Sequence, residues 1–175
     1  MDSHYKKIYP NLIKLKILDI KDLSENYINW LNDYKVTKHT DLIFQRHSLG
    51  SIKNYVSNMK KDKNNFLYGI FFKNIHIGNV KVGPILKAHQ TAYISYLIGE
   101  KEFWNKGLGR IVIKKIKNIC KKKHKLIKLN AGVSELHEPS QKVLLKNGFK
   151  LEGNFKKQIV YKKRRYSLLK YGCIL

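Results

Sequence analysis

The chain has 175 residues and carries 36 lysines and arginines against 12 aspartates and glutamates, a formal net charge of +24 at pH 7. Its hydrophobic content of 43% is ordinary for a folded protein and excludes wholesale disorder. No apolar run approaches the ~20 residues that span a bilayer. We therefore expect one domain over residues 1–175, and the polar N-terminus, which lacks the apolar stretch of a signal peptide, predicts a cytoplasmic protein.

The positive charge comes almost entirely from lysine. We expect most of these lysines on solvated surfaces, where their summed field attracts anionic small molecules or polyanions. Cys120 and Cys173 lie in apolar contexts, and we expect both to be buried free thiols.

The first third of the chain predicts one strand and two helices. Alternation predicts a strand over residues 12–18, and apolar spacing predicts a helix over 20–32. Residues 33–47 are typical of a loop or a broken helix, and Ser48 is a good N-cap for the next helix.

The remaining elements alternate between strands and helices, which indicates an α/β or α+β fold. Three strands are predicted over residues 66–72, 75–86 and 91–98. A helix over 108–123, a strand over 126–133 and a helix between Pro139 and Gly148 follow, and the chain closes with strand-like runs over 149–155, 158–161 and 165–175.

Two glycines, Gly107 and Gly109, stand between the strand over 91–98 and the helix over 108–123. They allow backbone N–H groups to converge, and the helix adds its unpaired N-terminal donors and its dipole. This arrangement predicts a cradle for a phosphate or pyrophosphate, with a plain tight turn as the alternative. Arg110 excludes a Walker loop, and Val112 excludes the third glycine of a dinucleotide fingerprint.

Three segments together resemble the GNAT superfamily of acyl-CoA N-acyltransferases. The first runs from Ile98 through Phe103-Trp104-Asn105-Lys106-Gly107-Leu108-Gly109-Arg110 and is similar to the family's pyrophosphate loop. The second is Val133–Phe149, which ends in Lys146-Asn147-Gly148-Phe149. The third, Asn29-Trp30-Leu31-Asn32-Asp33, resembles the branch that contains ribosomal-protein N-terminal acetyltransferases and bacterial amino-sugar acetyltransferases.

The resemblance implies a fold and a co-substrate. The fold would be a single GNAT-like domain with a mixed, mostly antiparallel twisted sheet of about six to seven strands, about four flanking helices and a splayed central strand pair. The co-substrate would be acetyl-CoA, with no metal. The residues implied to bind it are Leu97, Ile98, Trp104, Asn105, Lys106, Gly107, Leu108, Gly109, Arg110 and Ser140.

The resemblance also implies direct transfer within a ternary complex, without a covalent enzyme intermediate. The tyrosine that the family often uses as a general acid is replaced by Leu144, which cannot donate a proton. Candidate catalytic residues are therefore His137, Tyr96 and Ser140. Tyr93 lies on the opposite face of the same predicted strand from Tyr96, so at most one of the two faces the reaction.

The acceptor is expected to be a primary amine on an anionic small molecule, with a nucleotide-linked amino sugar favoured. The N-terminus of a protein, such as a ribosomal protein, is one alternative. A basic nucleic-acid-binding module is the alternative from another class, because the charge and the eleven tyrosines suit phosphate contacts and base stacking. Candidate acceptor-binding residues are Trp30, Asn32, Asp33, Phe44, Arg46, His76 and the basic turn over 156–165.

Overall fold

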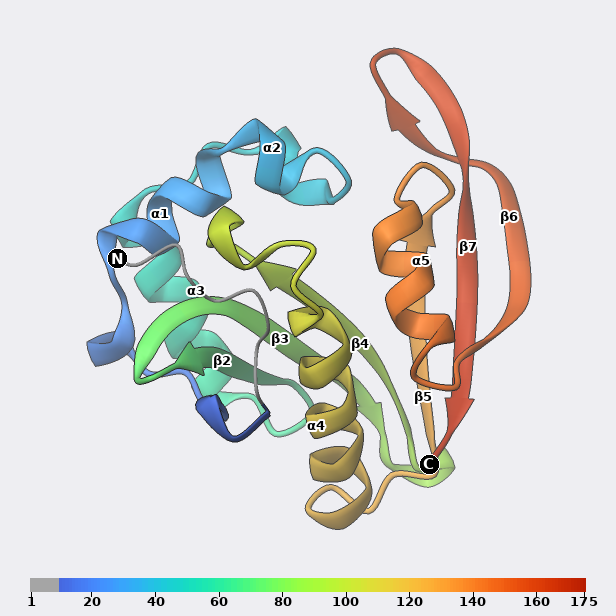
Figure 1. Ribbon diagram of the computed structural model, residues 1–175, viewed down its shortest axis with the longest axis horizontal. Helices are drawn as coiled ribbons and strands as arrows, with labels where there is room; N and C mark the ends of the chain where they lie inside the picture. Colours follow the sequence, from blue (N-terminus) through green and yellow to red (C-terminus); the bar gives the residue numbers. More distant parts are fainter. Residues whose placement is uncertain (1–9) are drawn as a thin grey trace.

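A computed structural model describes residues 10–175, in which seven strands form one sheet in the order β1-β2-β3-β4-β5-β7-β6 (Figure 1). All neighbouring strands are antiparallel except β4 and β5, which are parallel. The strands are β1 (Ile13–Ile17), β2 (Phe66–Phe72), β3 (Ile75–Leu86), β4 (Thr91–Ile98), β5 (Lys128–Ser134), β6 (Lys150–Tyr161) and β7 (Arg164–Ile174).

Helices cover both faces of this sheet. They are α1 (Glu25–Asn32), α2 (Tyr34–Thr37), α3 (Leu49–Lys61), α4 (Leu108–Lys122) and α5 (Glu138–Leu145). Figure 1 shows α4 and α5 in front of the sheet and α3 behind it. Two hydrophobic clusters follow from this arrangement: α4 and α5 pack on one face, and α1 and α3 pack on the other. Among the described residues, every helix is too short or too polar to cross a lipid bilayer.

The parallel pair β4–β5 is joined only at its start. Thr91, Ala92 and Tyr93 pair with Lys128, Leu129 and Asn130, and no pairing follows although β4 continues to Ile98. The strands therefore separate, and this opening is called the β4–β5 gap below. The predicted splayed central pair is confirmed.

Most predicted elements are confirmed, and the helix predicted over 20–32 is partly wrong. Asp19 and Asp22 form a capping box that closes a short 3-10 turn, η2 (Ile20–Asp22), and the chain is then extended at Leu23 and Ser24. The α-helix begins only at Glu25. Two capping carboxylates so close in sequence favour a short turn over a continuous helix.

The C-terminal strands also differ in detail from the prediction. The runs over 149–155 and 158–161 are one strand, β6, with a register irregularity between Phe155 and Ile159. Five α-helices replace the expected four, because the segment over 33–47 contains the four-residue α2. Cys120 and Cys173 are buried free thiols, as predicted.

Candidate active site

The turn before α4, residues 105–107, is held open by left-handed backbone. Asn105 has φ 59° and Gly107 has φ 77°. Gly107 is the N-cap of α4, and a β-carbon there would meet nothing within 4 Å. Leu108 is 1% exposed and packs the helix start into the core, and the N–H groups of the first turn have no acceptor within the helix. These residues, called the glycine turn below, fit a bound phosphate group.

At the end of β4, the backbone N–H and C=O groups of successive residues point alternately toward β3 and toward the β4–β5 gap. The Leu97 carbonyl lies against Gly78 of β3, only 2.3 Å from where a β-carbon on that glycine would sit. The backbone groups of Ile98 and Tyr96 therefore face the β4–β5 gap. The Ile98 carbonyl accepts a hydrogen bond from Trp104 Nε1 at 2.9 Å, which ties the chain ahead of the glycine turn to the strand. Of the two residues predicted to offer backbone groups, Ile98 faces the gap and Leu97 faces β3.

One side-chain contact crosses the gap. The Tyr96 hydroxyl donates a hydrogen bond to Ser140 Oγ on α5 at 3.2 Å. Gly109 lets α4 pack closely here, because a β-carbon on it would lie 3.2 Å from Val143 and 3.7 Å from the Tyr96 ring. Burial raises the pKa of Tyr96, so the phenol stays protonated at neutral pH and can donate a proton.

His137 occupies the N-cap position of α5. Its ring stacks on His39, with centroids 4.5 Å apart and planes 18° from parallel. Burial, with a smaller contribution from the nearby His39 and Lys38, lowers the pKa of His137 to about 4. Its Nδ1 is buried and has no hydrogen-bond partner within the described part of the chain. His137 is therefore neutral at neutral pH and supports His39.

A cavity of about 690 Å³ lies between the α1–α3 region, strands β3 and β4, and the β6–β7 hairpin. This large cavity has His39, Asn79, Ser95, Tyr96 and Leu97 among its lining residues, so it reaches the end of β4. Tyr34 and Tyr161 close part of its rim, because their hydroxyl groups are 2.5 Å apart and join α2 to β6.

The charged side chains around the large cavity are mostly positive. They are Lys38, Asp41, Arg46, Lys81 and Lys162. Between residues 10 and 175, none of the four cations is in an ion pair with a carboxylate. Such a wall attracts an anionic ligand.

Of the six residues predicted to bind the acceptor, Phe44 and Arg46 line the large cavity. Phe44 is 68% exposed at the cavity wall. The other four build the frame around it. Trp30 is buried, and its Nε1 donates to Glu100. His76 is buried and contacts Asn79.

The remaining two of the six fix the backbone that carries the cavity wall. Asn32 fixes the backbone of His47 by two hydrogen bonds. Its Nδ2 donates to the His47 carbonyl at 2.8 Å, and its Oδ1 accepts from the His47 N–H at 2.9 Å. Asp33 caps α2 through the Lys35 N–H and forms an ion pair with Lys101. Their polar atoms are engaged by the protein itself.

The basic turn predicted over 156–165 lines the cavity through Tyr161 and Lys162. Lining residues that the sequence does not single out include Tyr34, Lys38, His39, Asn79 and Lys81. Asn79 and Lys81 did carry a signal. They are polar residues two apart in the strand predicted over 75–86, so they share one face, and a polar pair on one face of an otherwise apolar strand indicates a functional surface. The others come from segments with no such pattern.

A splayed strand pair that leads through a glycine turn into a helix defines an acyl-CoA-dependent acetyltransferase. The chain belongs to the acetyltransferase (GNAT) domain family, whose model matches residues 12–150. It is an N-acetyltransferase that uses acetyl-CoA, and the open glycine turn and the β4–β5 gap fit this co-substrate.

Solved structures share the fold at low sequence identity. Spermidine N-acetyltransferase from Vibrio cholerae, in complex with CoA and spermine, has a TM-score of 0.83 at 17% identity, with 94% of this chain and 96% of that chain covered. RimL, a ribosomal L7/L12 alpha-N-protein acetyltransferase in complex with coenzyme A, has a TM-score of 0.84 at 16% identity, with 94% of each chain covered. No match was found among curated protein sequences.

Proposed function

We propose that the chain acetylates a primary amine on an anionic small molecule, and that a nucleotide-linked amino sugar is the best candidate acceptor. The observation that carries this proposal is the charge around the large cavity, whose lining residues include four cationic side chains and one carboxylate, that of Asp41. Arg46 and the neighbouring lysines suit phosphate oxygens, which accept several hydrogen bonds at once.

The same charges argue against a polyamine. Spermine, which the Vibrio cholerae enzyme holds in its complex, carries several positive charges. Each unpaired cation on the wall would repel such a molecule, and like charges brought together cost several kcal/mol. The shared fold therefore supports the chemistry of transfer, and the lining residues support a different acceptor.

The partly closed rim supports a small acceptor over the N-terminus of a protein. The Tyr34–Tyr161 contact bridges the mouth between α2 and β6. An extended peptide would need this bridge to open, whereas a small molecule fits within about 690 Å³.

We assign the chemical roles to groups at the junction of the β4–β5 gap and the large cavity. Acetyl-CoA supplies the acetyl group as a thioester. The Ile98 N–H, which faces the gap, polarises the carbonyl. Tyr96, held by Ser140, donates its proton to the departing thiolate and regains one from solvent. The amine nitrogen attacks the thioester carbon and the C–S bond breaks. His39 takes the proton that the nitrogen loses and releases it to solvent, and His137 keeps the His39 ring in place.

The assay that tests the acceptor class measures release of free CoA thiol with a panel of amines. The panel contains UDP-linked 2-amino and 4-amino hexoses, glucosamine, spermidine and a short peptide with a free N-terminus. We expect the highest kcat/KM with a nucleotide-linked sugar. Arg46→Gln should lower kcat/KM for that sugar and leave glucosamine unaffected.

The matched control is Lys121→Gln. This substitution also removes one positive charge, but Lys121 is exposed at the far end of α4. A preference for spermidine or for the peptide would refute the proposed acceptor class. Equal losses from Arg46→Gln with charged and uncharged acceptors would refute the role given to the cationic wall.

A further inference from the structure

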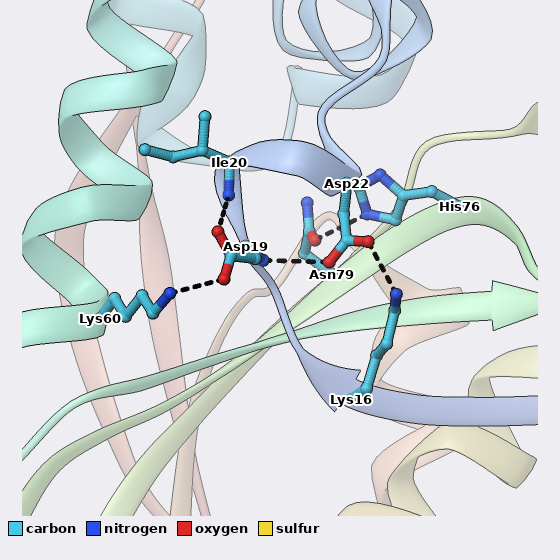
Figure 2. A network of polar contacts seen from close by, with 7 residues as sticks. All are labelled: Lys16, Asp19, Ile20, Asp22, Lys60, His76 and Asn79. Atoms are coloured by element: carbon cyan, nitrogen blue, oxygen red, sulfur yellow. Dashed lines mark hydrogen bonds and ion pairs between the residues drawn. The ribbon is translucent and has the colours of Figure 1, made fainter.

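Two polar side chains form a buried pair on β3. His76 is 7% exposed and Asn79 is 6% exposed. His76 Nε2 lies 2.9 Å from Asn79 Oδ1, as the dashed line in Figure 2 marks. An amide oxygen only accepts hydrogen bonds, so Nε2 carries the proton and Nδ1 is the unprotonated nitrogen.

The surroundings fix the imidazole of His76. The rings of Tyr27, Trp30 and Phe71 have centroids 5.5, 5.1 and 5.2 Å from its own. Burial lowers the pKa of His76, so the ring is neutral at neutral pH. Packing by three aromatic rings leaves the ring little freedom to rotate, and it therefore sets the orientation of the Asn79 amide.

Two ion pairs beside this site hold the chain that covers it. Lys16 binds Asp22 at 2.7 Å, and Lys60 binds Asp19 at 2.5 Å (Figure 2). They stabilise η2 next to His76 and make no hydrogen bond to the pair. Within the described residues, His76 Nε2 and Asn79 Oδ1 are hydrogen-bonded to each other.

The pair is incompletely satisfied. Asn79 Nδ2 and His76 Nδ1 are both buried and have no hydrogen-bond partner among residues 10–175. A buried donor without a partner costs free energy, and apolar residues would pack here without that cost. Asn79 also lines the large cavity and lies opposite Leu97 in the β3–β4 register, next to the end of β4. An unsatisfied donor at this position indicates a ligand group that completes it.

We propose that Asn79 is a specificity-determining residue for the acceptor and that His76 is its positioning residue. This inference rests on the proposed function. Nδ2 of Asn79 donates a hydrogen bond to a hydroxyl or carbonyl oxygen of the acceptor, which turns the amine toward the β4–β5 gap. His76 holds Oδ1, so the amide presents its donor and not its acceptor to the ligand. The pair selects an amine that carries an oxygen nearby, as an amino sugar does, and it disfavours a polyamine.

The central test replaces the donor by an acceptor of the same shape. With the panel amine that the wild-type enzyme uses best, Asn79→Asp should raise the acceptor KM about tenfold or more, since one hydrogen bond to the ligand is lost and a lone pair faces its oxygen. The acetyl-CoA Kd, measured by calorimetry, should stay within about twofold. Asn54→Asp, at an exposed position of α3, is the control and should change neither value.

His76 is tested by removal and rescue. His76→Phe keeps an aromatic ring and removes the Nε2–H, so the acceptor KM should rise while acetyl-CoA binding is retained. His76→Gln restores an N–H donor and should recover part of the loss. A merely structural role would instead lower Tm and both affinities together.

Two measurements decide the proposal without any acceptor. The double variant His76→Phe/Asn79→Leu should keep or raise Tm, because it removes the unpartnered Nδ2 donor without leaving the Nε2–H of His76 buried and unpaired, and ¹⁵N NMR should show His76 of the wild-type protein protonated on Nε2. A large fall in Tm, or protonation on Nδ1, would overturn the assignment.

The acceptor assays separate this inference from the proposed function. If a nucleotide-linked sugar is the substrate and Asn79→Asp leaves its KM unchanged, only the role of Asn79 fails. If spermidine is the best substrate and Asn79→Asp lowers its KM, both fail.

Discussion

The indole of Trp30 occupies the space that a side chain on Gly99 would need, with its Cδ2 atom 1.9 Å from the position of a β-carbon there. This contact seats α1 on the end of β4, where the backbone turns toward the glycine turn. Trp30 Nε1 also donates to Glu100, the next residue, so the two elements are joined by both packing and a hydrogen bond.

Gly99→Ala should destabilise the fold. The β-carbon would overlap the buried indole, and overpacking of this kind costs about 1–3 kcal/mol. Chemical denaturation measures the change in unfolding free energy. Gly50→Ala is the control, because Gly50 is the second residue of α3, a β-carbon there meets nothing closer than 3.8 Å, and helix propensity predicts a gain of less than about 1 kcal/mol. Equal effects of the two substitutions would contradict the role of the Trp30 contact.

Gly107→Glu should weaken acetyl-CoA binding more than it destabilises the fold. The new carboxylate would stand in the open space beside the first turn of α4 and repel the diphosphate, and its φ of 77° adds a modest strain. Calorimetry at moderate salt should show a Kd raised at least tenfold. Lys121→Glu makes a change of two charge units at the other end of the helix and should have a much smaller effect. An unchanged Kd for Gly107→Glu would place the diphosphate elsewhere.

Tyr96→Phe should lower kcat by about 10²-fold, since a positioned acid contributes roughly 10²–10⁴-fold. The phenylalanine preserves the packing against Gly109, so KM values should change little. Burial raises the pKa of Tyr96, and the acid form is lost only as pH rises through that raised value. The alkaline limb of the kcat profile should therefore lie above the ordinary tyrosine range and disappear in the variant.

Tyr93→Phe is the matched control for Tyr96, because Tyr93 lies on the opposite face of β4, 41% exposed, beneath the Lys170 ammonium. It should retain full turnover. A pH–rate profile that is identical in wild type and Tyr96→Phe would exclude the phenol from proton transfer.

Because His137 is half-buried in its neutral form, the free energy of unfolding should fall as the pH is lowered. Its pKa is about 4 in the folded chain and about 6.5 when unfolded. Below pH 6.5 the unfolded chain binds a proton that the folded chain does not, so the unfolding free energy falls between pH 6.5 and pH 4. His137→Phe keeps a ring against His39 and should flatten this dependence, as thermal melts across the range would show. Parallel curves for both proteins would refute the assignment.

The sequence predicted those parts of the fold that local patterns encode. The strands over 66–72, 75–86 and 91–98 have the predicted bounds, because alternation and turn residues fix them within a few positions. The turn at Gly107 is also predictable from the sequence, because glycine takes a left-handed backbone without steric cost. These elements carry most of the residues that are predicted to bind the co-substrate.

The cavity side depends on contacts between distant segments, which no local pattern encodes. Tyr34 and Tyr161 are 127 positions apart and meet through their hydroxyl groups. His39 and His137 stack from opposite halves of the chain. Trp30 and His76 are predicted to contact the acceptor, yet packing directs both into the frame behind the cavity wall.

The position of the glycine turn at the start of α4, and of the large cavity on the side covered by α1 and α3, has a kinetic consequence. With acetyl-CoA at the glycine turn and the acceptor in the large cavity, as proposed above, the two reactants would enter separately and meet beside the end of β4. Neither would have to leave before the other arrives, so we expect either order of addition. Spent coenzyme could then reside together with unreacted amine in a dead-end complex, and we expect inhibition at high amine concentration.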